Sequence, residues 1–178
     1  PMDPEKMVMA GATLYCDFGV AGIHTYTDSW DPITPNDPDD MCGAATLLYG
    51  DFGSSGDAFG VYRYDGAWTP LAGSDPSMIT TGGTDFYGWF PSLVGLYKYN
   101  GSWSVMTGAQ PQAMLANDTY FYGDFAHGFY RYDDTSGWAA LAAADGDNNM
   151  VMDGSNLYVD FGSMGLYRWN GSSWDVHL

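Results

Sequence analysis

The stretch NLYVDFGSMGLYRWNGSSW, residues 156–174, decides the fold, because its parts recur four more times along the chain. It contains two short runs rich in aromatic and β-branched residues, Leu157 to Phe161 and Gly165 to Trp169, which are typical of strands. Small residues separate the two runs, and the pair Asn170-Gly171 that follows is a strong tight-turn signal. Trp174 then opens another strand. The stretch is therefore predicted to be a β-hairpin followed by the start of a third strand.

Four further copies place the same elements in the same order. The Leu-Tyr or Phe-Tyr pair that starts each copy recurs every 34 to 38 residues, and an apolar residue seven positions earlier marks a strand before it. Four strands in ~36 residues, repeated five times, is the pattern of β-propeller blades. A solenoid would need polar end repeats, which neither the first nor the last copy has. The first residues of these pairs, here called the anchors, are Leu14, Leu48, Phe86, Phe121 and Leu157.

We therefore expect an all-β fold, a five-bladed β-propeller with four antiparallel strands per blade. Each blade is expected to come from one continuous segment of a single domain, 1–178. A tryptophan opens each expected fourth strand, and because all five copies keep it, we interpret it as a packing residue. The expected blades are about 4–37, 38–75, 76–110, 111–146 and 147–178.

The composition agrees with a packed β domain and limits the kinds of partner that the domain can bind. Hydrophobic residues make up 46% of the chain, and Glu5 is the only glutamate among 22 acidic residues. Aspartate in place of glutamate, together with 24 glycines and 9 prolines, favours tight turns over helices. Five basic residues leave a net charge of −17. This charge disfavours nucleic acid and anionic membranes, and suits divalent cations, neutral glycans or a salty medium.

Two sets of loops are expected on one face, those joining second to third strands and those joining fourth strands to the next blade. The second-to-third loops vary in length from two to seven residues, whereas the other set is nearly constant. Length variation on a rigid scaffold is where binding differences usually reside. The candidate ligand-binding residues in the variable loops are Asp57, Phe59, Ser92, His127 and Met164.

The loops between blades also carry many aspartates, so this face is predicted to be acidic. An EF-hand starting at Asp145 is rejected, because Met150 and Asn156 stand where its glycine and glutamate belong. A looser calcium site built from aspartate side chains and loop carbonyls stays open, and no other cofactor is expected. The candidate metal ligands are Asp37, Asp39, Asp40, Asp75, Asp145 and Asp147.

Charged residues also recur at equivalent positions inside the blades. They could form a ring of sites for a charged or polyhydroxylated ligand, or a repeated cross-strand or inter-blade ion pair. The pattern favours the ion pair. The basic set is Arg63, Lys98, Arg131 and Arg168, and the acidic set is Asp17, Asp51, Asp124 and Asp160.

The two cysteines, Cys16 and Cys42, fall in adjacent blades, and two interpretations stay open. A disulfide would suit an extracellular β domain, and a small buried thiol would suit a repeat position that is otherwise glycine or valine.

The sequence gives little support for a catalytic function. The chain has no Gly-x-Ser-x-Gly or His-Glu-x-x-His sequence, and its three histidines lie in unrelated contexts. The Asp-Phe-Gly triplets fall inside the repeated hairpins, with no accompanying kinase motifs. We therefore expect no enzyme activity. No stretch reaches the ~20 apolar residues that span a bilayer, so membrane insertion is not expected.

The repeats, which read roughly M-V-x-x-G-x-x-L-Y and then G-L-Y-R-Y-N-G-S-W, resemble kelch-like and tachylectin-like propeller repeats of secreted proteins. The resemblance covers Pro4 to Trp174. It implies a non-enzymatic extracellular or cell-surface module that binds a glycan or another cell-surface polymer. The alternative is a structural subunit of a surface layer, fibre or larger adhesin, which self-associates with or without calcium.

Overall fold

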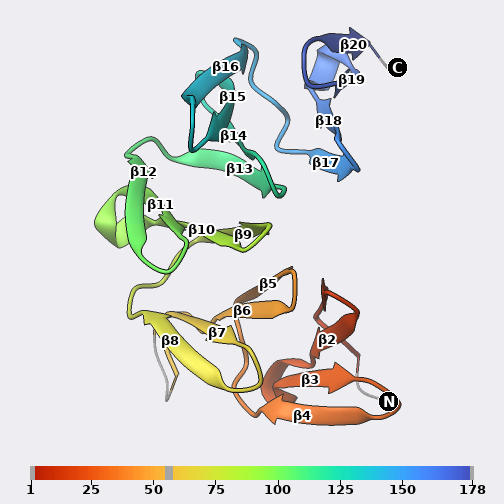
Figure 1. Cartoon of the computed structure of the whole chain (residues 1–178), viewed down its shortest axis with the longest axis vertical. Helices are drawn as coiled ribbons and strands as arrows, with labels where there is room; N and C mark the ends of the chain where they lie inside the picture. The colour runs from red at the N-terminus through yellow and green to blue at the C-terminus, as the bar shows by residue number, and fades with distance from the viewer. Residues whose placement is uncertain (1–2, 55–57, 177–178) are drawn as a thin grey trace. The chain divides into compact units, whose positions relative to one another are not determined.

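The computed structural model describes residues 3–54 and 58–176 of the 178-residue chain. In these residues the chain forms strands β1 to β20 and three short 3₁₀ turns, arranged as five four-stranded antiparallel sheets. Each sheet is built from four consecutive strands, so each has its own part of the colour range in Figure 1. The predicted all-β fold with five continuous four-stranded blades is confirmed.

The chain divides into two compact units, Pro1–Gly108 and Ala109–Leu178. The first unit holds three sheets. The first sheet is β1 (Lys6–Ala10), β2 (Thr13–Asp17), β3 (Ile23–Tyr26) and β4 (Trp30–Thr34), with η1 (Gly19–Ala21) between β2 and β3. The second is β5 (Asp40–Ala44), β6 (Leu47–Asp51), β7 (Val61–Tyr64) and β8 (Trp68–Ala72). The third is β9 (Met78–Gly82), β10 (Asp85–Phe90), β11 (Gly95–Tyr99) and β12 (Trp103–Thr107), with η2 (Pro91–Leu93).

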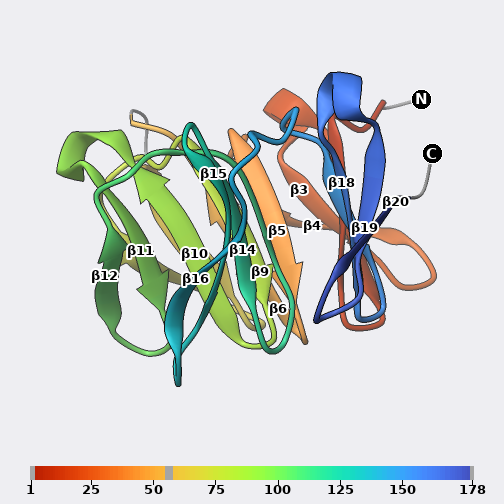
Figure 2. The ribbon, with the colours of Figure 1, turned by 90° about the horizontal axis from the view of Figure 1, so that it is seen from above.

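The second unit holds two sheets of the same design. One is β13 (Pro111–Ala116), β14 (Phe121–Phe125), β15 (Gly128–Asp133) and β16 (Gly137–Ala142). The other is β17 (Met150–Asp153), β18 (Asn156–Asp160), β19 (Leu166–Trp169) and β20 (Trp174–Val176), with η3 (Gly162–Met164). Figure 2, a view from above, shows β18, β19 and β20 running side by side within this last sheet.

The repeat anchors form the buried centre of the blades. They open or nearly open the second strand of each sheet, and four of them, Leu48, Phe86, Phe121 and Leu157, have no exposed surface. Leu14 is half-buried. Tight turns join the third and fourth strands, and Gly101 and Gly171 there have φ of 106° and 96°, as the Asn-Gly pairs predict. Burying a large apolar side chain in each hairpin is what makes the repeat fold as a sheet.

A group of three aromatic side chains recurs in every sheet. A phenylalanine after or at the end of the second strand packs edge-to-face on a third-strand ring and on the tryptophan that opens the fourth strand. In the third sheet, Phe90 lies 5.8 Å from Tyr97 and 5.5 Å from Trp103, measured between ring centroids. In the first sheet His24 takes the place of the tyrosine, 5.3 Å from Phe18. Such pairs add to the stability that burial gives.

The opening tryptophan also links neighbouring sheets within each unit. The indole Nε1 of Trp68 donates a hydrogen bond to the Ile33 carbonyl at 3.2 Å, and Trp103 donates to Leu71 at 3.0 Å. In the second unit Trp174 donates to Leu141 at 2.9 Å. In each case the acceptor lies three residues after the tryptophan of the preceding sheet. These residues are therefore packing residues that also fasten one blade to the next.

Candidate functional site

The candidate ligand-binding residues lie in hairpin loops of four different sheets. Phe59 and Met164 are 49% and 52% exposed, and Ser92 and His127 are also exposed. Asp57 lies outside the described residues. Phe59 lies close to Gly73, which lines a cavity together with Leu93, the neighbour of Ser92.

A shallow cavity of ≈ 290 Å³ lies beside one of these loops, between the second and third sheets. Its lining includes the half-buried rings of Tyr97 and Trp103, the buried Phe90 and the loop residue Leu93, which is 51% exposed. Leu71, Ala72, Gly73 and Ser74 complete the lining. Aromatic faces next to a few polar groups are the usual lining of a small-ligand site. The sequence pattern points to the loop but not to the aromatic rings next to it.

Three of the four acidic residues at the repeated second-strand position are deeply buried. Asp17, Asp51 and Asp124 are 3%, 2% and 1% exposed. One carboxylate oxygen of each accepts a main-chain N–H: Asp17 from Gly19 at 2.9 Å, Asp51 from Gly53 at 3.1 Å. Asp124 accepts from Gly146 at 3.0 Å, and its Oδ2 is buried without a hydrogen-bond partner among the described residues. Asp160 accepts from Gly162 in the same way but is only half-buried.

Burial raises the pKa of these buried carboxyls, and other carboxylates raise it further. The pKa of Asp51 rises to about 7, first through burial and then through repulsion by Asp75, Asp39 and Asp40. Burial raises the pKa of Asp124 to about 6, with repulsion from Asp145 adding to it. The pKa of Asp17 is also raised, mainly by burial and further by Asp37 and Glu5. Negative charge on these groups is therefore costly in the folded protein.

Two groups of three carboxylates gather around the buried aspartates of the first unit. The first triad, Glu5, Asp17 and Asp37, places one carboxylate oxygen from each residue within 4.8 Å of the others. The second triad, Asp39, Asp51 and Asp75, lines a cavity of ≈ 310 Å³. Asp40 also lines this cavity, but its carboxylate forms an ion pair with Lys6.

The candidate metal ligands are thus divided among several places. Asp37 falls in the first triad, Asp39 and Asp75 fall in the second, and Asp145 lies near Asp124. Asp147 is exposed near Gly162. The predicted metal ligands do not include Glu5, and the sequence pattern does not connect the loop aspartates with Asp17 and Asp51. The sequence does carry a signal for these groups. In both triads the first two carboxylates stand at the same sequence distances from the anchor of their blade, and the third stands farther from it in the second triad because that blade has a longer loop.

The recurring basic residues do not pair with the recurring aspartates in the ion pairs that the structure describes. Arg63 pairs with Asp65 at 3.1 Å, Lys98 with Asp85 at 2.7 Å and Arg168 with Asp175 at 2.8 Å. Arg131 lies 4.3 Å from the centroid of the Tyr120 ring. The expected pairing of the two sets is corrected here. Each basic residue lies opposite a tyrosine across the hairpin, as Arg63 lies opposite Tyr49, and this tyrosine is two positions from the aspartate. The basic side chain extends toward the end of the strand away from the aspartate.

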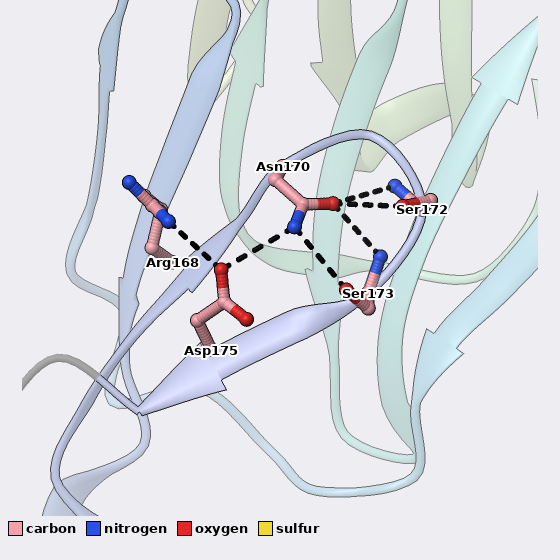
Figure 3. A network of polar contacts seen from close by, with 5 residues as sticks. All are labelled: Arg168, Asn170, Ser172, Ser173 and Asp175. Atoms are coloured by element: carbon pink, nitrogen blue, oxygen red, sulfur yellow. Dashed lines mark hydrogen bonds and ion pairs between the residues drawn. The ribbon is translucent and has the colours of Figure 1, made fainter.

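A turn asparagine organises the opposite end of the last blade. In the last blade, Asp175 accepts from both Arg168 and Asn170, whose own Oδ1 accepts the N–H groups of Ser172 and Ser173 (Figure 3). The side chain of Asn170 therefore closes the turn.

Both cysteines are free thiols in the structure. Cys16 is 1% exposed in β2, and Cys42 is half-buried in β5. Cys16 occupies the position held by Gly50, Gly88 and Gly123 in other sheets, where a phenylalanine ring two residues later folds back over the strand. A side chain at those glycines would press against that ring, and Cys16 is among the smallest alternatives. Burial raises the pKa of the Cys16 thiol.

No protein-family model and no curated protein matches the chain in sequence. The ectodomain of the receptor kinase CR4 from Physcomitrella patens matches 98% of this chain and 52% of its own length, with 13% identity and a TM-score of 0.70. PorZ, a surface component of the type-IX secretion system of Porphyromonas gingivalis, matches 98% of this chain and 26% of its own, with 12% identity and a TM-score of 0.65.

An enzyme has the same architecture. The gluconolactonase XC5397 of Xanthomonas campestris matches 89% of this chain and 69% of its own, with 14% identity and a TM-score of 0.57. The fold of this chain is that of a β-propeller. The resemblance to kelch-like and tachylectin-like repeats extends to this fold and not to a family. The chain spans about half the length of the CR4 ectodomain and about a quarter of PorZ. Among the described residues no helix is long and apolar enough to cross a membrane.

Proposed function

We propose that this propeller is a non-catalytic extracellular binding module that binds glycans or a similar cell-surface polymer. The observation that carries the proposal is the cavity beside Leu93, whose lining includes the half-buried rings of Tyr97 and Trp103. Aromatic faces can cover the apolar faces of sugar rings, and main-chain groups and Ser74 can bond hydroxyls. Its size, ≈ 290 Å³, suits one or two sugar residues. The likeness to a receptor ectodomain and a bacterial surface component supports the extracellular location.

A glycan array probed with the full chain, with and without calcium, tests the proposal. The informative variant is Leu93→Asp, which places a charge at the rim of the cavity without touching the core. Val20→Asp is the matched control, because Val20 is 94% exposed in the corresponding loop of the first blade. We expect at least tenfold weaker binding of any glycan hit for Leu93→Asp, on the order of 1.4 kcal/mol, and no change for the control.

Two results would overturn this function. If no glycan on the array binds, or if both variants bind a hit as wild type does, the cavity is not a glycan site. The competing function is a structural subunit of a larger assembly, in keeping with the longer chains of CR4 and PorZ. Concentration-dependent or calcium-dependent growth in size-exclusion chromatography, without glycan binding, would support that function in its place.

A further inference from the structure

Exposed apolar side chains from two neighbouring sheets gather at the cavity beside Leu93. Val94, the next residue in the same loop, is 67% exposed. Phe59, in the hairpin loop of the second sheet, is about half exposed, and a methyl group at Gly73 would lie 3.4 Å from Cε2 of its ring. Because Gly73 lines the cavity, the Phe59 ring lies at the border of the cavity. Apolar side chains that are grouped on a surface in this way often mark a binding site.

The loop that carries Leu93 is held in a strained conformation. Val94 ends the short 3₁₀ turn with a φ of 49°, in the left-handed region that β-branched residues rarely adopt. Gly22 and Gly165 end the corresponding turns of the first and fifth sheets, with φ of 76° and 94°. The third sheet therefore has an exposed valine at a position where glycine fits without strain. Such strain is concentrated at sites that contact ligands.

The charges around the cavity select against anionic ligands. Among the described residues that line it, none has a charged side chain. Lys98, the basic residue of the third sheet, is buried and forms an ion pair with Asp85 at 2.7 Å. The chain as a whole has a net charge of −17. A carboxylate or sulfate on a sugar would find no basic partner in the cavity and would be repelled by the surrounding field.

We propose that the ligand of this site is a neutral oligosaccharide that continues from the cavity onto Phe59. The inference rests on the proposed glycan-binding function and adds to it a class of glycan and a residue that sets specificity. Because the cavity of ≈ 290 Å³ suits one or two sugar residues, a shorter ligand leaves the Phe59 ring uncovered. A longer one packs its next sugar ring against Phe59, which gives the site a preference for chain length.

The probe is a glycan array with neutral, sialylated, sulfated and uronate-containing glycans of one to about ten sugars. The tightest hit is then titrated as a free oligosaccharide, together with its shortened forms, by isothermal titration calorimetry on the full chain. We expect the hit to be neutral and at least three sugars long. It should bind about three- to tenfold more tightly than its one- and two-sugar forms, the range that one aromatic contact supplies.

Three variants test the role of Phe59. Phe59→Ala should bind the long and the short forms equally, with the affinity that wild type has for the short ones. Phe59→Trp should keep the preference for the long form, because it keeps an aromatic ring at the border. Tyr26→Ala is the matched control, since Tyr26 is a similarly exposed aromatic residue in the first sheet, and it should bind as wild type does. Thermal melts check that each variant is folded.

The outcomes separate this inference from the function on which it rests. If Leu93→Asp loses binding but Phe59→Ala still prefers the long form, glycan binding stands and the role of Phe59 is overturned. If the tightest hits are anionic, the function stands and the neutral class is overturned. If Tyr26→Ala loses the preference as Phe59→Ala does, the effect is not specific to Phe59 and the inference is wrong. If no glycan binds, both the function and the inference are overturned.

Discussion

At the residue scale, the buried carboxyls make stability depend on pH. Asp124 has a pKa raised to about 6 from 3.8, by burial and by Asp145, so the folded state holds its proton more tightly than the unfolded state does. The contribution of Asp124 to stability is therefore fully present below about pH 4, falls as pH rises to about 6 and stays at its lower level above that. We predict that Asp124→Asn, which removes the buried charge, is more stable than wild type at pH 7.5, by up to about 3 kcal/mol.

Thermal melts of both proteins in chelator at pH 4.5 and pH 7.5 measure this effect. The advantage of the variant should shrink toward pH 4.5, where Asp124 is mostly protonated in wild type. An advantage that is equal at both pH values would show that the asparagine acts through packing and not through charge.

Trp103 shows how much one packing residue contributes. Its indole contacts Phe86, Phe90 and Tyr99 and donates to Leu71 in the preceding sheet. Trp103→Ala should therefore lower the free energy of unfolding by about 3–5 kcal/mol. Val105→Ala, in the same strand at a side chain that is 66% exposed, should change it by less than about 0.5 kcal/mol. Urea denaturation followed by far-UV circular dichroism compares them, and a Trp103→Ala variant as stable as wild type would contradict the packing role.

At the element scale, the first sheet is the one whose aromatic group is incomplete. β3 has His24 where the other third strands have tyrosine, and the His24 Nδ1 is buried without a hydrogen-bond partner among the described residues. We predict that His24→Tyr stabilises the protein by about 0.5–1.5 kcal/mol, through a better edge-to-face contact with Phe18 and the loss of an unpaired polar atom. Tm measured by calorimetry tests this. A lower Tm would mean that the first sheet has no room for the larger ring.

Within the strands and turns, the sequence predicts the features that recur in every repeat. Strand positions, the buried anchors and the positive φ of turn glycines such as Gly171 follow from local patterns, because each hairpin must bury its own apolar residue. The pairing of charges does not follow in this way. Arg63 forms an ion pair with Asp65 in the adjacent turn, whereas the charged neighbours of Asp51 are the loop carboxylates. Which partner a charged residue contacts depends on the direction and burial of its side chain. The repeat shows which residues occupy equivalent positions, but it does not show which side-chain atoms come into contact.

At the scale of the whole molecule, sites arise where blades adjoin, and this is what a single repeat cannot show. Glu5, Asp17 and Asp37 are spread over one blade and the loop leading to the next, and they come together only when the sheets fold and pack. The cavity beside Leu93 likewise needs Leu71 from one sheet and Trp103 from the following one. Neighbouring blades within a unit can therefore gather different side chains at their junctions while keeping one packing scheme.

The same dependence on neighbours predicts unequal stability along the chain. The second sheet is packed between the first and third sheets of its unit. Toward the first sheet, Gly43 lets β5 approach the Met9 carbonyl, and Trp68 adds a hydrogen bond. Toward the third sheet, the Thr81 hydroxyl donates to the Gly43 carbonyl at 2.7 Å, and Trp103 adds a hydrogen bond. In the second unit the fifth sheet has the Trp174 link and a last strand of only three residues. We expect native-state hydrogen exchange to show lower protection for residues 157–161 than for residues 48–52, because local opening follows the density of buried contacts. Both segments are second strands with a fully buried anchor, and Tyr158 and Asp160 are half-buried where Tyr49 and Asp51 are buried, which acts in the same direction. Equal or higher protection at 157–161 would show that inter-sheet links within the units do not set the order of opening.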